Sequence, residues 1–317
     1  MDKRFLDFLE LAPRSRKPRI RGLTTIGEHG YAIGWLGEML EMWGEYIDIV
    51  KLTPTSLHVP SNTMEKKVKL YRDHNIGVGI DDPIFAIAYH QGKADQLLRT
   101  LRDLGFTDVQ VDTQHIKLGE KGNSKKAAED ELHYIAKARE MGFSVIGEVG
   151  LKTPDGDLAR AGEGKLNVEA VVEEMKRLLQ LGCHHVYLES KVIRDVIGNY
   201  GEKESGTEQI RRVVDAVGQD NIFIEVAGRA FNTRMCQRFW AVRNFGPEVN
   251  MSAGGSLEEI RYVEAVRRGN TFVHGPSRTT SRLWLKSLVK NGGKAAEEWW
   301  KEEYPIDLNE MKATNAG

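Results

Sequence analysis

Carboxylates stand in or at the ends of four successive apolar segments of this chain. They are Asp112, Glu148, Glu189 and Glu225. Each segment is short, apolar and rich in β-branched residues, which is typical of a buried parallel strand. The carboxyl ends of parallel strands lie at one edge of a sheet, where active sites are built. We therefore expect these acids to gather in one site.

Acids that crowd together repel one another, and each raises the pKa of its neighbours. A hard divalent cation relieves that repulsion, and oxygen ligands from separate strands suit Mg²⁺. The sequence therefore predicts a magnesium site with the four acids as ligands. The alternative is a salt-bridge network with nearby cations, which are Lys51, Lys152, Lys191 and Arg229.

Two of these lysines suggest specific chemistry. Lys152 follows the fifth apolar segment, where it can act as a general acid or as a point charge on an anion. Lys51 points into the core if Asp48 points outward. An inward lysine can form a Schiff base, although pairing with an acid is commoner. The candidate catalytic residues are Lys51, Glu148 and Lys152.

Polar groups near the last strands are candidates for binding a small anionic substrate. The Gly254-Gly255-Ser256 turn opens a helix, where free backbone N–H groups can hold a phosphate. A plain tight turn is the alternative. The predicted substrate-binding residues are Lys191, Arg229, Asn250, Ser252, Gly254 and Gly255.

A regular alternation of strands and helices positions these residues. The expected strands cover residues 19–26, 46–53, 76–81, 108–113, 143–153, 185–189, 221–227 and 248–253. The expected helices cover residues 34–44, 63–74, 85–104, 124–141, 167–181, 206–217, 231–243 and 256–268. Eight such units favour an α/β fold of the (β/α)8 TIM barrel type, with an open doubly wound sheet as the alternative.

The chain is expected to form one barrel domain over residues 1–275, followed by a C-terminal helical extension over 276–317. The extension contains Trp284, Trp299 and Trp300 in amphipathic segments. It is expected to pack on the barrel, which is the commoner case, or on a neighbouring subunit. Because barrel enzymes commonly self-associate and the tryptophan-rich extension offers a surface for this, a homo-oligomer is expected. The glycine-rich run 151–165 is either a lid or a solvated loop.

Composition argues against several classes of protein. The 317 residues carry a net charge of −1, so no basic surface indicates nucleic-acid binding. No run approaches the ~20 apolar residues of a membrane span. The two cysteines lack metal-type spacing and the N-terminus lacks a signal-peptide core, so a cytoplasmic protein is expected.

The order and spacing of several motifs give residues 18–271 a resemblance to the phosphosulfolactate synthase family. The motifs include KPRIRGLT (17–24), YIDIVKL (46–52), GEVGLK (147–152), YLES (187–190), IFIEVA (222–227), FGPEVNM (245–251) and VEAVRRG (263–269). The resemblance implies a (β/α)8 barrel that adds sulfite to phosphoenolpyruvate with Mg²⁺, in coenzyme M biosynthesis.

The resemblance also implies roles for single residues. Lys152 looks like the family's proposed acid, which protonates the enolate carbon after sulfite attack. The carboxylates resemble its proposed magnesium site. The residues that stand where the family has the same types are Lys51, Glu148, Lys152, Glu189, Glu225 and Asn250.

Departures from the family pattern concern the substrate. Asp81 and Asp82 stand where the family typically has a glycine turn, and Ala86 replaces a glutamate. Gln114 closes a segment in which the family has E-I-S-D-G, and Glu28 replaces an early aspartate. Two added acids disfavour sulfite or phosphate unless a metal offsets their charge. The scaffold is therefore expected to be retained, while a changed substrate stays open.

Three functions follow from these features. The leading hypothesis is a phosphosulfolactate synthase-like lyase that adds sulfite, or a related nucleophile, to phosphoenolpyruvate or a similar small anionic enol or carboxylate. The first alternative is a metal-dependent aldolase or isomerase that enolises a different carbonyl substrate. The second alternative is a non-catalytic, stress-related barrel protein.

Overall fold

The computed structural model describes residues 5–113, 124–150, 165–226, 230–253 and 255–270. The predicted extension and nearly all of the glycine-rich run lie outside these ranges. So do three predicted site residues and one departure from the family pattern, which are Lys152, Arg229, Gly254 and Gln114. None of the described helices combines the length and the apolar character that crossing a membrane requires.

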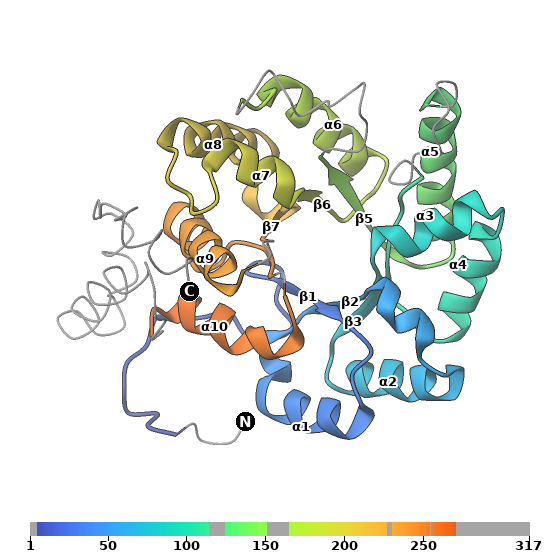
Figure 1. Cartoon of the computed structure of the whole chain (residues 1–317), viewed down its shortest axis with the longest axis horizontal. Coiled ribbons are helices and arrows are strands. Elements are labelled where there is room, and N and C mark those ends of the chain that lie inside the picture. Colours follow the sequence, from blue (N-terminus) through green and yellow to red (C-terminus); the bar gives the residue numbers. More distant parts are fainter. Residues whose placement is uncertain (1–4, 114–123, 151–164, 227–229, 254, 271–317) are drawn as a thin grey trace.

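Eight parallel strands form one sheet that curves into a nearly closed barrel (Figure 1). They are β1 (Thr24–Glu28), β2 (Ile49–Leu52), β3 (Gly77–Ile80), β4 (Asp108–Gln110), β5 (Ser144–Val149), β6 (His185–Leu188), β7 (Ile222–Glu225) and β8 (Met251–Ser252). The first strand pairs with the last. Between β3 and β4, the Thr107 N–H donates to the Val78 carbonyl at 2.9 Å. The predicted (β/α)8 barrel is confirmed.

Helices surround this barrel on the outside (Figure 1). They are α1 (Ile33–Trp43), α2 (Ser61–Asp73), α3 (Asp82–His90), α4 (Ala94–Asp103), α5 (Ser124–Glu140), α6 (Val168–Gln180), α7 (Ser190–Ile197), α8 (Glu204–Val217), α9 (Phe231–Phe245) and α10 (Ile260–Arg268). Short 3-10 helices cover η1 (Gly44–Tyr46), η2 (Pro54–His58), η3 (Gln219–Asn221) and η4 (Leu257–Glu259).

Two helical regions differ from the prediction. Residues 85–104 were expected to form one helix, but α3 ends before Gly92, whose φ of +66° cannot continue a right-handed helix. The chain then restarts as α4. The sequence also missed α7, which follows β6 directly and buries Val192, Ile193 and Val196.

Side chains of the strands alternate between two environments, as the pleat requires. Outward residues such as Val50, Val109 and Val186 join the large core between the sheet and the helices. Inward residues form a smaller cluster inside the barrel, which contains Leu23, Ile49, Ile146, Tyr187 and Phe223. The alternation therefore directs Lys51, two residues after Ile49, into the barrel.

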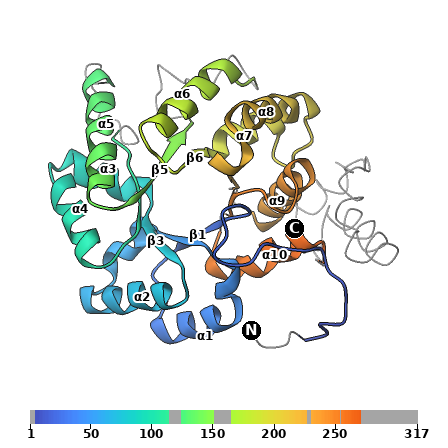
Figure 2. The ribbon, with the colours of Figure 1, turned by 180° about the vertical axis from the view of Figure 1, so that it is seen from behind.

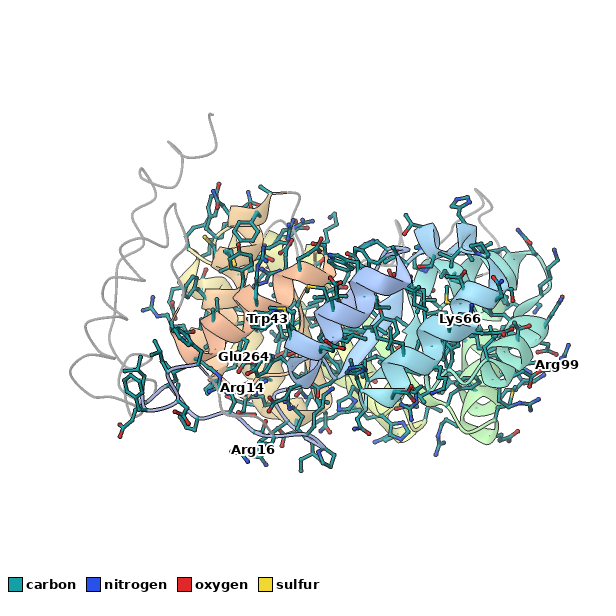
Figure 3. The ribbon with its side chains drawn as sticks, turned by 90° about the horizontal axis from the view of Figure 1, so that it is seen from below. Arg14, Arg16, Trp43, Lys66, Arg99 and Glu264 are labelled. Carbon is teal, nitrogen blue, oxygen red and sulfur yellow. The ribbon has the colours of Figure 1, made fainter. Side chains whose placement is uncertain are left out.

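The segment before β1 covers the amino-terminal end of the strands and is held there by salt bridges. Arg14 lies beside Glu264 (Figure 3), with 3.2 Å between Arg14 Nε and Glu264 Oε2. Its Nη1 lies 2.9 Å from Glu248 Oε2. Figure 2 shows this segment (dark blue) running past α10 toward β1. Fully buried Arg267 donates to the Val249 carbonyl at 2.7 Å on the same side. These contacts leave the carboxyl end of the strands for the site.

His185 inside the barrel is expected to make the fold sensitive to acid. Its ring packs against Phe223 with 5.0 Å between centroids, and burial lowers its pKa to about 4. In the unfolded chain the His185 imidazole has a pKa of about 6.5, so it binds a proton at a pH at which the folded chain keeps it neutral. The free energy of unfolding should therefore fall as the pH drops from about 6.5 to 4, by on the order of 2–3 kcal/mol.

Urea denaturation at several pH values measures this effect. The His185→Phe variant keeps an aromatic ring against Phe223 and should show a flatter dependence over this pH range. Equal slopes for the variant and the original chain would contradict the assignment, because all other titrating groups are common to both proteins.

Candidate active site

Lys51 is the centre of a polar group at the carboxyl end of the barrel. In register with it stand Gly27 on β1 and Gly79 on β3. Because neither neighbour has a side chain, the long lysine side chain has room to cross the barrel toward β6. Its ammonium ends over the Tyr187 ring, 4.3 Å from the centroid.

In the part of the chain that the structure describes, the Lys51 ammonium has three partners. Its Nζ lies 2.9 Å from Asp81 Oδ1 and donates to Gln110 Oε1 at 3.3 Å. The third partner is the face of the Tyr187 ring, which attracts cations. A lysine ammonium has three N–H donors, so these partners account for all of them. The residue is only 6% exposed.

Lys51 is a permanent cation. Burial alone would lower its pKa, but Asp81, Tyr187 and Glu225 hold the pKa well above the ordinary lysine value. A Schiff base requires the neutral amine as nucleophile. The contacts of Lys51 therefore favour pairing with an acid, which was the second alternative for this lysine. A fixed charge here can stabilise negative charge that develops in a transition state.

Asp81 is held as the matching anion. Burial would raise the pKa of its carboxyl, but the ion pair and hydrogen bond with Lys51 hold that pKa below its usual value. Its side chain is 24% exposed against 8% for Lys51, so Asp81 is the outer member of the pair. The next residues that depart from the family, Asp82 and Ala86, lie buried in α3.

Gln110 links Lys51 to a predicted catalytic residue. Its Oε1 accepts from Lys51, and its Nε2 donates to the Glu148 carboxylate. Gln110 is 1% exposed, so the link is shielded from water. The structure thus joins β2, β4 and β5 in one chain of hydrogen bonds through Lys51, Gln110 and Glu148.

Tyr187 fixes the surface on which the ammonium rests. It is fully buried, and its hydroxyl donates to Thr25 Oγ1 at 3.0 Å. Its ring also packs against Phe223, with centroids 5.2 Å apart. Burial raises the pKa of the phenol to about 12, so Tyr187 stays neutral. The ring therefore supports the Lys51 ammonium without carrying a charge of its own.

Glu225 carries a carboxylate with one occupied oxygen. Its Oε2 accepts the Ser190 N–H at 2.9 Å, and no described residue donates to Oε1. Burial raises the pKa of Glu225, while Lys51 acts in the opposite direction. In register beside it stands Ser252, which is 5% exposed. An oxygen with no donor among the described residues, facing Lys51 across the barrel, is a suitable ligand for an ion or a substrate.

The other two predicted metal ligands have different surroundings. Asp112 is fully buried. Glu189 lies against Gly150, where an added Cβ would collide with the Glu189 carboxylate. In the described part of the chain, no three His, Cys, Asp or Glu side chains are grouped to hold a metal. The oxygen donors fit the mode in which Mg²⁺ uses one or two carboxylates and takes its other ligands from water and substrate.

Two predicted substrate-binding residues do not join this group. Asn250 accepts the Leu23 N–H and donates to the Asp220 carbonyl, both at 2.9 Å. These partners precede β1 and β7, so Asn250 ties together the amino ends of the strands. Lys191 is exposed on α7 and pairs with Asp195 of the same helix at 3.1 Å. Neither Asn250 nor Lys191 is part of the site proposed below.

The turn after β8 is held from several sides. Gly255 has a φ of +81°, and an added Cβ there would collide with Glu259. The carboxylate of Glu259 is bound by Arg234 and Arg238. The Leu257 N–H, which begins η4, donates to the Tyr31 hydroxyl at 3.0 Å. That amide is therefore occupied and does not face the site as a phosphate donor.

Sequence reasoning missed Gln110, Tyr187 and His29 as parts of the site. Gln110 and Tyr187 each stand two residues before a predicted ligand, so strand alternation was the available signal. His29 is exposed beyond β1. Its Nδ1 lies 3.2 Å from Thr53 Oγ1, and its Nε2 lies 3.3 Å from the Gly255 carbonyl. It thereby links the ends of β1, β2 and β8.

Comparison with known proteins identifies the family. A family profile described as (2R)-phospho-3-sulfolactate synthase (ComA) matches residues 12–272. The phosphosulfolactate synthase of Methanothermobacter thermautotrophicus is 26% identical over 267 residues, covering 83% of this chain and 94% of that protein. The phosphosulfolactate synthase of Methanocaldococcus jannaschii is 27% identical over 254 residues, covering 78% and 92%.

Among solved structures, the orotidine 5'-phosphate decarboxylase of Pyrococcus horikoshii OT3 is a distant likeness. It has a TM-score of 0.43 and 12% identity, and the match covers 77% of this chain and 99% of that one. The family profile spans the barrel from the segment before β1 to the end of α10. This chain belongs to the phosphosulfolactate synthase family.

Proposed function

We propose that this chain is a lyase of the phosphosulfolactate synthase family that adds sulfite, or a related nucleophile, to phosphoenolpyruvate or a similar small anionic enol. The observation that carries the proposal is the Lys51 group at the carboxyl end of the barrel. There a buried, permanent cation lies between Asp81 and Gln110 and faces Glu225.

The proposed reaction needs few parts from the protein. The sulfur lone pair of sulfite attacks the methylene carbon of phosphoenolpyruvate, and the electron pair of the double bond moves toward the carboxylate. The neighbouring carbon then takes a proton, for which Lys152 is the proposed acid. Lys51 lowers the energy of the negative charge as it develops, because it is fixed and desolvated before the reaction begins.

Mg²⁺ is part of the proposal. Glu225 would hold it through Oε1, with Glu148, Glu189 and Asp112 as the other candidate ligands and with substrate oxygens completing its shell. When bound, the ion supplies Lewis-acid stabilisation of an enolate oxygen. The same proposal places the protein in the cytoplasm as a homo-oligomer that binds no nucleic acid. Sedimentation of a monomer at high protein concentration would contradict the self-association.

Calorimetric titration of the metal-stripped protein tests the proposed substrate. Phosphoenolpyruvate should bind when Mg²⁺ is present, and its binding should be lost when a chelator removes the ion. Sulfite and phosphoenolpyruvate should then disappear together in an assay of turnover. A protein that binds neither Mg²⁺ nor phosphoenolpyruvate would contradict the proposal.

The ion pair between Lys51 and Asp81 favours a second candidate. Asp81 offsets the charge of Lys51 at 2.9 Å, and such a site suits a neutral carbonyl better than a free phosphate. The second candidate is therefore a metal-dependent aldolase or isomerase that enolises a carbonyl substrate. Binding of Mg²⁺ without binding of phosphoenolpyruvate would favour it over the first.

A further inference from the structure

Among the described residues, partners already occupy all three N–H donors of Lys51. Its three partners are Asp81 at 2.9 Å, Gln110 at 3.3 Å and the ring of Tyr187 at 4.3 Å. Gln110 and Tyr187 are 1% and 0% exposed and lie on the inner side. Asp81, with a side chain that is 24% exposed, is the partner nearest to solvent. An anion that approaches Lys51 from the solvent at the carboxyl end of the barrel therefore meets Asp81 first.

The backbone holds Asp81 in this place. The Asp81 N–H donates to the Leu52 carbonyl at 3.0 Å, next to Lys51 on β2. The Asp81 carbonyl accepts the Ile84 N–H at 3.1 Å, in the first turn of α3. The residue thus joins the end of β3 to α3 with both backbone groups bonded. Its carboxylate is anchored over the ammonium and is not a loose side chain on the rim.

We propose that Asp81 is a specificity-determining residue, because its carboxylate occupies the position on Lys51 that an anionic group of a substrate would take. This inference rests on the proposed function in placing the substrate at the carboxyl end of the barrel. It selects a substrate whose group near Lys51 is neutral or already bound to a metal. Free phosphate is disfavoured at this position, because Asp81 repels it and holds the donor that it needs.

Binding of inorganic phosphate to the full chain tests this inference. The Asp81→Ala variant frees one donor of Lys51 and removes a negative charge beside it. We expect it to bind phosphate at least tenfold more tightly than the original chain in calorimetric titrations. The Asp215→Ala variant removes the same charge from the exposed face of α8 and should bind phosphate as the original does.

A double variant links the gain to Lys51. In the Lys51→Met, Asp81→Ala protein the tighter binding should disappear. If Asp81→Ala does not fold, Asp81→Asn keeps the hydrogen bond, removes the charge and should show a smaller gain. The inference is overturned if folded variants at Asp81 bind phosphate no better than the original, or if the gain survives the loss of Lys51.

The same titrations separate this inference from the proposed function. Phosphate binding to a freed Lys51 requires no turnover, so the gain is measurable whatever reaction the protein catalyses. Failure of the original chain to bind phosphoenolpyruvate with Mg²⁺ would contradict the proposed function alone. Normal phosphoenolpyruvate binding with no gain in the Asp81 variants would overturn the specificity role alone.

Discussion

Replacement of Lys51 by methionine is expected to lower kcat/KM for sulfite addition by about 1,000-fold. It removes the fixed positive charge opposite Asp81 and Glu225, and it leaves Asp81 without its cation. Breaking one side of a buried ion pair costs about 3–5 kcal/mol of stability. We therefore expect the free energy of unfolding to fall by about that amount. Steady-state kinetics and urea denaturation measure the two effects.

A second change separates chemistry from folding. Adding Asp81→Asn to Lys51→Met removes the orphaned charge and should restore most of the lost stability, while activity stays low. The matched control is Lys69→Met, which removes a lysine from an exposed pair with Asp73. That pair should be worth less than about 1 kcal/mol. Near-normal activity of the Lys51→Met protein would remove this lysine from the mechanism.

Replacement of Glu225 by glutamine is expected to lower activity by about 100-fold or more without destabilising the protein. The new amide side chain would keep the volume and an oxygen for the Ser190 N–H, which now donates to Oε2 at 2.9 Å. It loses the charge with which Glu225 would hold Mg²⁺. Calorimetry should show weaker binding of Mg²⁺, by about tenfold, and kinetics should show the loss of turnover.

The sign of the stability effect follows from the raised pKa of Glu225. Burial raises that pKa above the unfolded value, so protonation of Glu225 stabilises the folded state relative to the unfolded state. This contribution is complete below the unfolded pKa and is lost as the pH rises through the folded one. At neutral pH the charged group costs stability, and glutamine should leave the free energy of unfolding unchanged or higher. Glu173→Gln, on the exposed face of α6, is the control and should change neither property.

The barrel, and the strand ends at which the candidate site residues stand, could be predicted because both depend on local pattern. Strand–helix alternation shows in the spacing of apolar residues, and acids at strand ends show in the same stretches of sequence. Inward direction follows from alternation within one strand, as for Lys51 after Ile49. These features need no knowledge of which strands face one another.

Contacts across the barrel could not be predicted in the same way. Tyr187 resembles an ordinary core aromatic in its own strand, and only the closed barrel brings Lys51 over its ring. The residue at which a strand begins also decides which side chains reach the carboxyl end of the barrel. Residues 248–253 were expected to be a strand, but β8 begins at Met251. Asn250 consequently lies at the amino end, bonded to the backbone, rather than among the groups around Lys51.

Turnover of the purified chain tests whether the protein adds sulfite to phosphoenolpyruvate. Phosphoenolpyruvate, sulfite and Mg²⁺ are supplied together, and the product is followed by mass spectrometry and phosphorus NMR. We expect a product with the combined mass of phosphoenolpyruvate and bisulfite, formed only with Mg²⁺ and lost in the Lys51→Met and Lys152→Ala proteins. Binding of Mg²⁺ and phosphoenolpyruvate without any such product, from a folded protein, would contradict sulfite addition as the function.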